Sequence, residues 1–211
     1  MFHASSHIET CPIRLIVRQQ PVKARLCSFK EKVDRRPVDP PPVVQLECQR
    51  QEMLHDPNLF LYATLVDTRG DDIHFTNQAT PSTAGAVVQS LHKLRDTENK
   101  EGGYFIFDDI SVRQEGHFRF KFSLFRIVES HVFYLCSILS DTFQVYSPKT
   151  FPGMSESTDL TKWFSDQGVR VRIRRNSNTA KRRRTTAQDM MSMQNLLLPP
   201  IQKNGCHQPV D

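Results

Sequence analysis

The chain has 211 residues, 38% of them hydrophobic and 24% charged, and its formal net charge is +5. That length suits one ordinary domain with tails, and no apolar run approaches the roughly 20 residues that a membrane-spanning helix needs. Residues 1–17 lack the basic and apolar regions of a secretory signal, so we expect a protein of the cytosol or nucleus with no membrane partner.

Three strands are predicted in the first third of the chain. Ile13, Leu15 and Val17 recur at every second position, a period that indicates a strand with one buried face. The stretch 23–42 is charged and rich in proline without a helical period, so it is predicted to be a long loop. Two further apolar runs predict strands, VVQLECQ at 43–49 and LFLYATLVD at 59–67.

Residues 76–102 interrupt this pattern of strands with small and polar side chains. They predict a variable surface connection, because clusters of Ser, Thr, Asn, Gly and Pro between periodic segments are typical of loops. At most a short helix is expected within this connection, over 84–94.

The second half of the chain returns to strand-like patterns. The most regular run is HFRFKFSLFRI at 117–127, in which Phe118, Phe120 and Phe122 alternate with polar residues. A turn is predicted just before this run, and a break in the strand pattern near Ser140–Asp141 after it. The other strands expected here lie at 104–107, at 110–113, and on one or both sides of the break within 132–147.

A short helix is predicted at 157–168, capped by Ser157 or Thr158 and ended by Gly168. A final strand is predicted directly after it, at 169–174, because Val and Ile alternate there with arginine. One face of that strand would therefore be apolar and the other strongly basic.

Seven or eight short strands with one or two minor helices predict a mainly β fold. No alternation of strands and helices favours a parallel sheet, so an antiparallel β-sandwich or barrel is expected. We place one domain at 10–176, between an N-terminal tail at 1–9 and a basic C-terminal tail at 177–211 that is predicted to be disordered.

No motif in the sequence points to catalysis or to a metal. Nucleophile-elbow, phosphate-loop, dinucleotide and zinc-protease patterns are missing, and the adjacent Asp108 and Asp109 would point to opposite faces of a strand. We therefore expect no enzyme, no cofactor and no metal. The cysteines are dispersed and are expected to be reduced thiols; they are Cys11, Cys27, Cys48, Cys136 and Cys206.

The positive charge of the chain is concentrated in one segment. Residues 170–184 hold eight of the 28 Lys and Arg and no acid, and the other 20 cations are outnumbered by 23 Asp and Glu. Any basic surface on the rest of the chain must therefore be local.

One local cluster lies on the loop before the second predicted strand and comprises Lys30, Lys32, Arg35 and Arg36. Four prolines follow it closely; each fixes φ at about −65°, so this loop should lose less entropy on ordering than a glycine-rich one. An ordered array of cations suits the phosphates of a polyanion. Arginine can also donate two hydrogen bonds to the edge of a guanine base. A solvated charged loop without a ligand is the alternative.

Two further basic features lie near the C-terminus. Arg170, Arg172 and Arg174 would share one face of the final strand, but their distance from the basic loop depends on the tertiary structure. The run RRNSNTAKRRR fits either a nuclear-import address or a non-specific nucleic-acid arm, with a solvated tail as the alternative. The residues assigned to import are Arg174, Arg175, Lys181, Arg182, Arg183 and Arg184.

Four blocks of the sequence resemble the velvet domain of fungal developmental regulators. They are LIVRQQPVKARLCSFKEKVDRRPVDPPPVVQL, LFLYATLVD, YFIFDDISVRQEGHFRFKFSLFRI and FQVYSPKTFPGMSESTDLTKWFSDQGVRVRIRRN, and they follow the family order across residues 10–176. The resemblance implies an Ig-like sandwich similar to the Rel-homology DNA-binding domain. It also implies homodimers or heterodimers with other velvet proteins, a nuclear location with a cytoplasmic pool, and binding to promoter DNA.

The same resemblance assigns the DNA contact to the basic loop, which carries over onto Lys30, Lys32, Arg35 and Arg36. Flanking contacts are expected from Lys23 and Arg25, and from the arginines at 170–174. The leading hypothesis is a dimeric transcription regulator of sporulation, sexual development and secondary metabolism that reaches the nucleus through an import receptor. The compact chain with its own basic cluster favours the spore-viability branch, and another velvet branch is the alternative. The alternative is a protein-interaction scaffold in a velvet complex whose partner supplies most of the DNA contact.

Overall fold

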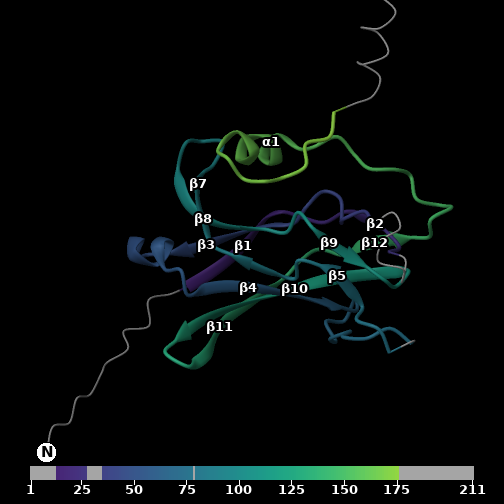
Figure 1. Ribbon diagram of the computed structural model, residues 1–211, viewed down its shortest axis with the longest axis horizontal. Coiled ribbons are helices and arrows are strands. Elements are labelled where there is room, and N and C mark those ends of the chain that lie inside the picture. The colour runs from purple at the N-terminus through teal and green to yellow at the C-terminus, as the bar shows by residue number, and fades with distance from the viewer. Residues whose placement is uncertain (1–12, 28–34, 78, 176–211) are drawn as a thin grey trace, which may run out of the picture. The chain divides into compact units, whose positions relative to one another are not determined.

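A computed structural model describes residues 13–27, 35–77 and 79–175 (Figure 1). Its strands form two principal sheets, as expected for an antiparallel β-sandwich. The first sheet has the order β1 (Ile13–Gln19), β3 (Val43–Cys48), β8 (Glu101–Ile106) and β7 (His92–Arg95). The second has the order β2 (Lys23–Arg25), β12 (Phe143–Tyr146), β10 (Gly116–Val128), β4 (Leu59–Val66) and β6 (Val88–Ser90), with β11 (His131–Leu139) also paired to β10.

Three smaller elements complete the described part of the chain. They are the two-stranded pair β5 (Thr83–Gly85) and β9 (Ile110–Val112), the 3₁₀ helix η1 (Gln51–His55) and the helix α1 (Asp159–Asp166). The mainly β class predicted from the sequence is confirmed. None of the described helices is both long and apolar enough to cross a bilayer. The tails predicted at 1–9 and 177–211 lie outside the described residues.

Strand β10 is the centre of the second sheet. It pairs with β4 on one side, and with first β12 and then β11 on the other. Its alternating phenylalanines point into the sandwich, where Phe120 stacks on Phe143 at a ring distance of 4.9 Å and Phe122 lies 5.1 Å from Phe107. Each buried aromatic side chain contributes about 1.5–3 kcal/mol, so the regular pattern at 117–127 supplies much of the core.

Strand β8 is buried on both faces, and this makes α1 a third layer. Phe105 points into the main core, whereas Tyr104 and Ile106 belong to a second apolar cluster with Phe164 of α1. The Tyr104 and Phe164 rings lie 4.9 Å apart. In Figure 1, α1 lies over the sheet that contains β3 and β8, on the side away from β10.

The helix α1 is fixed at its first turn by a buried glutamine from β1. The Gln19 amide donates hydrogen bonds to the carbonyl oxygen of Pro41 at 2.7 Å and to the Thr161 hydroxyl at 3.0 Å. Thr158 donates to Gln19 at 2.5 Å, and its hydroxyl accepts from the Thr161 amide, so Thr158 is the N-cap of the two residues predicted. Gly168, at φ +93°, follows the helix as expected.

The predictions for the two irregular segments were wrong in detail. The stretch 23–42, predicted to be entirely a loop, contains the short strand β2, which pairs in parallel with β12. The connection 76–102 contains β5, β6 and β7, and the possible helix at 84–94 is absent. These strands form because β9, β4 and β8 offer unpaired edges, which local composition does not reveal. The described residues consequently form twelve strands rather than seven or eight.

The predicted final strand at 169–174 is also wrong. This segment pairs with no other strand, although Val169 and Val171 still pack against the second apolar cluster. The Val171 amide bonds to the carbonyl oxygen of Val169 at 2.9 Å, a three-residue turn centred on Arg170. The alternating pattern therefore reflects partial burial on the body of the protein rather than pairing in a sheet.

Candidate nucleic-acid interface

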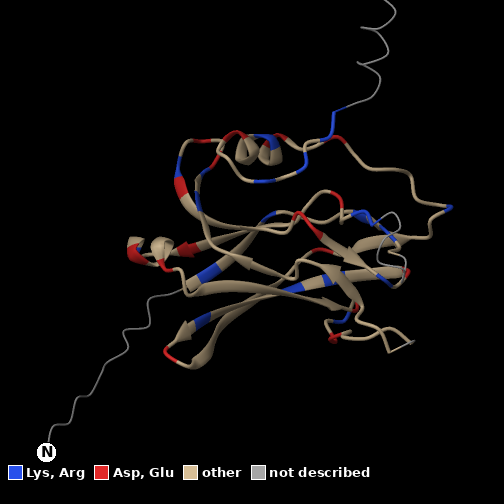
Figure 2. Ribbon diagram, in the orientation of Figure 1, with Lys and Arg blue, Asp and Glu red and all other residues tan. Residues whose placement is uncertain are grey.

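Two segments far apart in the sequence meet at one basic pocket. Residues 35–37 of the proline-rich loop and residues 172–174 after α1 line a cavity of about 350 Å³. We call it the arginine pocket, and its lining residues are Arg35, Arg36, Pro37, Met154, Arg172 and Arg174. Figure 2 shows basic residues on the ribbon at β2 and along the segment that follows α1. The two basic sites that sequence reasoning left separate are therefore neighbours.

The pocket is held together by the buried carboxylate of Asp39, which is 2% exposed. Its Oδ2 accepts a hydrogen bond from the Ser155 amide at 2.6 Å and lies 3.7 Å from Nζ of Lys23. Its Oδ1 lies 3.8 Å from Nη1 of Arg174. One acid thereby joins β2, the loop before α1 and the segment after it, because a buried charge is stable only when it is paired and hydrogen-bonded.

Arg174 is fixed by its backbone as well as by its side chain. Its amide donates to the Ser157 hydroxyl at 2.8 Å, and its carbonyl oxygen accepts from the Ser157 amide at 3.1 Å. Burial lowers the pKa of the Arg174 guanidinium, the nearby cations Arg172 and Arg36 lower it further, and Asp39 opposes them. Arginine stays protonated in proteins, so the pocket concentrates positive charge that an anion would relieve.

The guanidinium of Arg35 forms an ion pair with an acidic side chain of the same protein. Its Nη2 donates to both carboxylate oxygens of Asp109, at 2.7 and 2.6 Å. Both side chains are substantially exposed, at 39% and 44%, so the ion pair is screened by water and can exchange with another anion. Carboxylate and phosphate suit the same planar fork of donors. Arg35 is therefore partly neutralised here and available to a competing phosphate.

The position of Asp109 is set by the turn between β8 and β9. Its carbonyl oxygen accepts a hydrogen bond from the Ala86 amide at 2.7 Å. Gly85 allows this approach, because it adopts φ +92° and a Cβ there would lie 1.9 Å from that oxygen. The two adjacent acids do not act as a pair, since Asp109 faces Arg35 whereas Asp108 lines a different pocket.

The remaining predicted site residues are distributed more widely. Lys30 and Lys32 of the basic loop, and the import cluster Lys181, Arg182, Arg183 and Arg184, lie outside the described residues. Lys23 shares Asp39 with Arg174, and Arg25 lies on the same face of β2 as Lys23 because the intervening Ala24 is buried. Arg175 is exposed.

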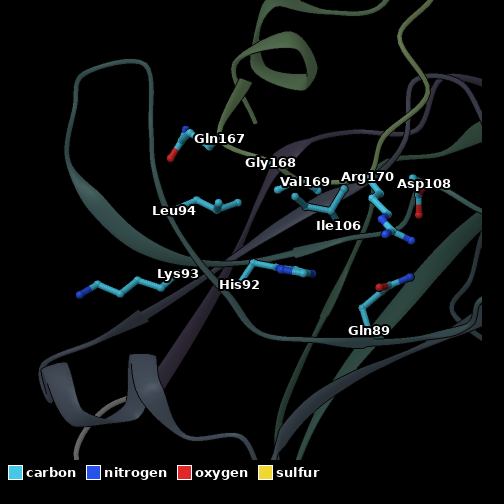
Figure 3. Close-up of a pocket in the computed structure, with 10 residues that line it drawn as sticks. All are labelled: Gln89, His92, Lys93, Leu94, Ile106, Asp108, Gln167, Gly168, Val169 and Arg170. Atoms are coloured by element: carbon cyan, nitrogen blue, oxygen red, sulfur yellow. The ribbon is translucent and has the colours of Figure 1, made fainter. Parts of the chain in front are cut away.

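Arg170 does not join the arginine pocket. It lines a second pocket of about 400 Å³, between the end of α1 and strands β7 and β8, together with His92 and Asp108 (Figure 3). The turn centred on Arg170 breaks the alternation that would have placed it beside Arg172. Desolvation raises the pKa of the Asp108 carboxyl, the neighbouring Asp109 adds to this, and His92 opposes it.

Sequence reasoning missed the acids that organise the arginine pocket. Asp39 was visible only as part of the DPPP run, and Asp109 only as half of an acid pair. Neither residue type nor spacing indicates that an acid is buried against two cations, since that requires contact between β2 and the segment after α1. No group of His, Cys, Asp or Glu in the described ranges has an arrangement that could hold a metal ion.

These observations define the chain as a mainly β sandwich protein with a lateral helix and a cationic pocket. The family model of the velvet factor matches residues 13–80 and 68–178, so the chain belongs to the velvet family and the resemblance noted in the sequence is confirmed.

Curated relatives agree with this assignment. The chain is 44% identical to the spore development regulator RYP2 of Ajellomyces capsulatus, over 83% of this chain and 46% of that protein. It is 41% identical to a velvet complex component of Chaetomium globosum (82% of this chain, 40% of that protein). It is 39% identical to the developmental and secondary metabolism regulator ve1 of Gibberella zeae (80% and 37%). The chain thus spans less than half the length of these relatives.

The substitution Asp39→Asn should destabilise the fold by about 2–4 kcal/mol, because it leaves the partly buried Arg174 and Lys23 without their shared carboxylate. Urea unfolding followed by circular dichroism measures this change. The control Asp166→Asn, at the exposed end of α1, should stay within about 0.5 kcal/mol of the parent. Equal unfolding midpoints for the parent and Asp39→Asn would contradict the role given to Asp39.

The substitution Asp108→Asn should stabilise the protein at neutral pH. The native pKa of this carboxyl is raised, so the native state holds the proton more tightly and loses stability as pH rises through the raised pKa. The asparagine variant has no ionisable carboxyl at position 108, so it does not lose this stability. Its melting temperature should exceed that of the parent at about pH 7, and the gap should shrink toward about pH 4. A gap that does not change with pH would show that desolvation of Asp108 is unimportant.

Proposed function

We propose that this velvet-family chain is a non-enzymatic, DNA-binding regulator of fungal development that acts in the nucleus as a dimer. The observation that carries the proposal is the arginine pocket, a single cavity lined by four arginines from two distant segments. Counterion release from phosphates favours binding at such a cluster. The printed names of the relatives, which include spore development and secondary metabolism regulators, support the same biological role.

The residues of the pocket divide into two roles in this mechanism. Arg174 is partly buried and fixed by Asp39 and Ser157, so it anchors a backbone phosphate at a defined place. Arg172 is exposed, and no salt bridge joins it to another described residue. It therefore meets a phosphate without first breaking an ion pair within the described part of the chain.

The loop arginines supply the second role, the reading of bases. Arg35 can exchange the Asp109 carboxylate for a guanine edge or a phosphate, since both can accept two hydrogen bonds from its planar guanidinium. Because the exchange costs Arg35 one ion pair, a misplaced DNA acceptor stabilises the complex little. Asp109 thus favours DNA that presents its acceptors in the right geometry.

The alternative function is a protein scaffold in a velvet complex, with DNA contacted mainly by the partner. The name of the Chaetomium globosum relative, which describes it as part of a velvet complex, favours assembly of this kind. The two functions differ in whether the purified chain binds DNA without a second protein.

The double substitution Arg36→Ala/Arg172→Ala should weaken DNA binding at least about tenfold, since each arginine removed takes away a phosphate or base contact. A duplex selected by the purified chain from a random-sequence pool serves as the probe, with fluorescence anisotropy as the measurement. The slope of log affinity against log salt should fall by about 0.9 for each phosphate that is no longer bound.

Arg69→Ala is the single-charge control for this experiment. Arg69 is 81% exposed, pairs with Asp67 and Asp71, and lies outside the pocket, so its removal changes the net charge without touching the site. If the control reduced log affinity by half as much as the double variant, the effect would be explained by net charge alone, because the control removes one positive charge and the double variant removes two. If the parent chain selects no duplex alone but does so with a velvet partner, the scaffold function replaces the proposed one.

Nuclear import through the C-terminal basic cluster is a separate part of the proposal. Replacing Lys181, Arg182, Arg183 and Arg184 with Ala in a fluorescently tagged full chain should lower the nuclear-to-cytoplasmic ratio, because import addresses depend on clustered cations. DNA binding in vitro should fall less than in the double variant Arg36→Ala/Arg172→Ala. Unchanged nuclear accumulation would assign import to the arginines at 170–175 or to a partner protein.

A further inference from the structure

The pocket between the end of α1 and strands β7 and β8 has an apolar floor, and we call it the Arg170 pocket after the arginine that lines it. Its volume of about 400 Å³ lies at the lower end of the range for small-molecule sites. Leu94 of β7, Ile106 of β8 and Val169 form the floor, and all three belong to the second apolar cluster. Because Leu94 and Ile106 are buried, the floor is part of the packed core.

Four polar side chains gather beside this floor. Figure 3 shows them at one end of the Arg170 pocket, and they are Gln89, His92, Asp108 and Arg170. They come from β6, from β7, from the turn after β8 and from the segment after α1, so only the folded chain brings them together. Polar groups that converge next to a buried apolar surface are typical of sites for small molecules.

Two other polar residues at the rim of the Arg170 pocket are already engaged elsewhere. Lys93 extends away from the polar end in Figure 3, and its Nζ lies 3.1 Å from a carboxylate oxygen of Glu101 and 3.3 Å from Nε2 of His55. The Gln167 amide bonds to the backbone of Arg95 twice, accepting from its amide and donating to its carbonyl oxygen, both at 2.8 Å. The four side chains at the polar end are therefore the ones that can meet a ligand.

The charges at the polar end indicate what kind of ligand fits. Arg170 and Asp108 carry opposite charges, and no salt bridge within the described part of the chain joins either to another residue. Desolvation raises the pKa of the Asp108 carboxyl, as expected for an acid whose charge is incompletely compensated. A plain anion would be repelled by Asp108, and a plain cation by Arg170. A ligand that carries both charges would meet an opposite charge at each.

We propose that the Arg170 pocket binds a small zwitterion with an apolar body, the chemical class of the free α-amino acids. Arg170 pairs with the carboxylate of the ligand, Asp108 pairs with its ammonium group, and its apolar side chain covers the floor. Gln89 and His92 supply further hydrogen bonds. The Arg170 pocket shares no lining residue with the arginine pocket, so this binding is independent of the proposed function in DNA binding.

The test compares probes that differ by one charged group. L-phenylalanine carries both charges, phenylpropionate lacks the ammonium group, and phenethylamine lacks the carboxylate. NMR titration of the isotope-labelled full chain at neutral pH measures the dissociation constant of each probe. Phenylalanine should bind at least about tenfold more tightly than either analogue, because each analogue loses one charge-assisted hydrogen bond. The amide signals that shift should be those at 92–94, 106–108 and 168–170, which surround the pocket.

Two substitutions assign the charged groups of the ligand to their partners. Arg170→Gln should weaken phenylalanine binding at least about tenfold and leave phenethylamine binding no weaker, since the amine has no carboxylate for Arg170. Asp108→Asn should likewise weaken phenylalanine binding and leave phenylpropionate binding no weaker. Arg69→Gln is the matched control for Arg170→Gln, because it also removes one positive charge; Arg69 is 81% exposed and lies outside the pocket. This control should bind phenylalanine as the parent does.

Several results would overturn the proposal. One is a titration in which no probe shifts the signals of the pocket up to its solubility limit. Another is phenylpropionate binding as tightly as phenylalanine, which would make the ligand a plain organic anion. Phenylalanine binding that survives both Arg170→Gln and Asp108→Asn, in variants folded by circular dichroism, would place the ligand elsewhere. No step of the test uses DNA, so its failure would leave the proposed regulatory function untouched.

Discussion

The buried carboxylate of Asp39 is the interaction on which the arginine pocket depends. It meets Lys23 of β2, the Ser155 amide and Arg174 within one small volume, so the segments before and after α1 are tied to the edge of the second sheet. A charge that is 2% exposed cannot stay unpaired without a large desolvation cost. The cations are therefore held at fixed positions, and a fixed cationic array binds phosphate with little further loss of entropy.

The third layer formed by α1 has the same effect. Gln19 of β1 satisfies the first turn of the helix, and Phe164 closes over Tyr104 on the outer face of β8. Together these contacts position residues 169–174 on the body of the protein although this segment pairs with no strand. The basic residues after the helix thus occupy a definite place, which a free tail of the same composition would not provide.

Under the proposed function, acids next to the arginines give the pocket selectivity as well as structure. Asp39 is buried and permanent, whereas Asp109 is exposed and can be displaced from Arg35. A polyanion can bind Arg172 and Arg174 without displacing Asp109, but binding to Arg35 requires that exchange.

The amino-acid sequence by itself determined the fold class, the strands from 104 to 147, the helix with Ser157 or Thr158 as its cap, and membership of the velvet family. These follow from local periodicity and from long motifs. It also marked Arg35, Arg36, Arg172 and Arg174 as basic sites. Only the tertiary structure decided that these four meet while Arg170 faces another pocket, that 84–94 forms strands, and that 169–174 does not. The reason is physical: strand pairing and burial of a charge depend on partners distant in the sequence, whereas periodicity reports only which side of a segment is apolar.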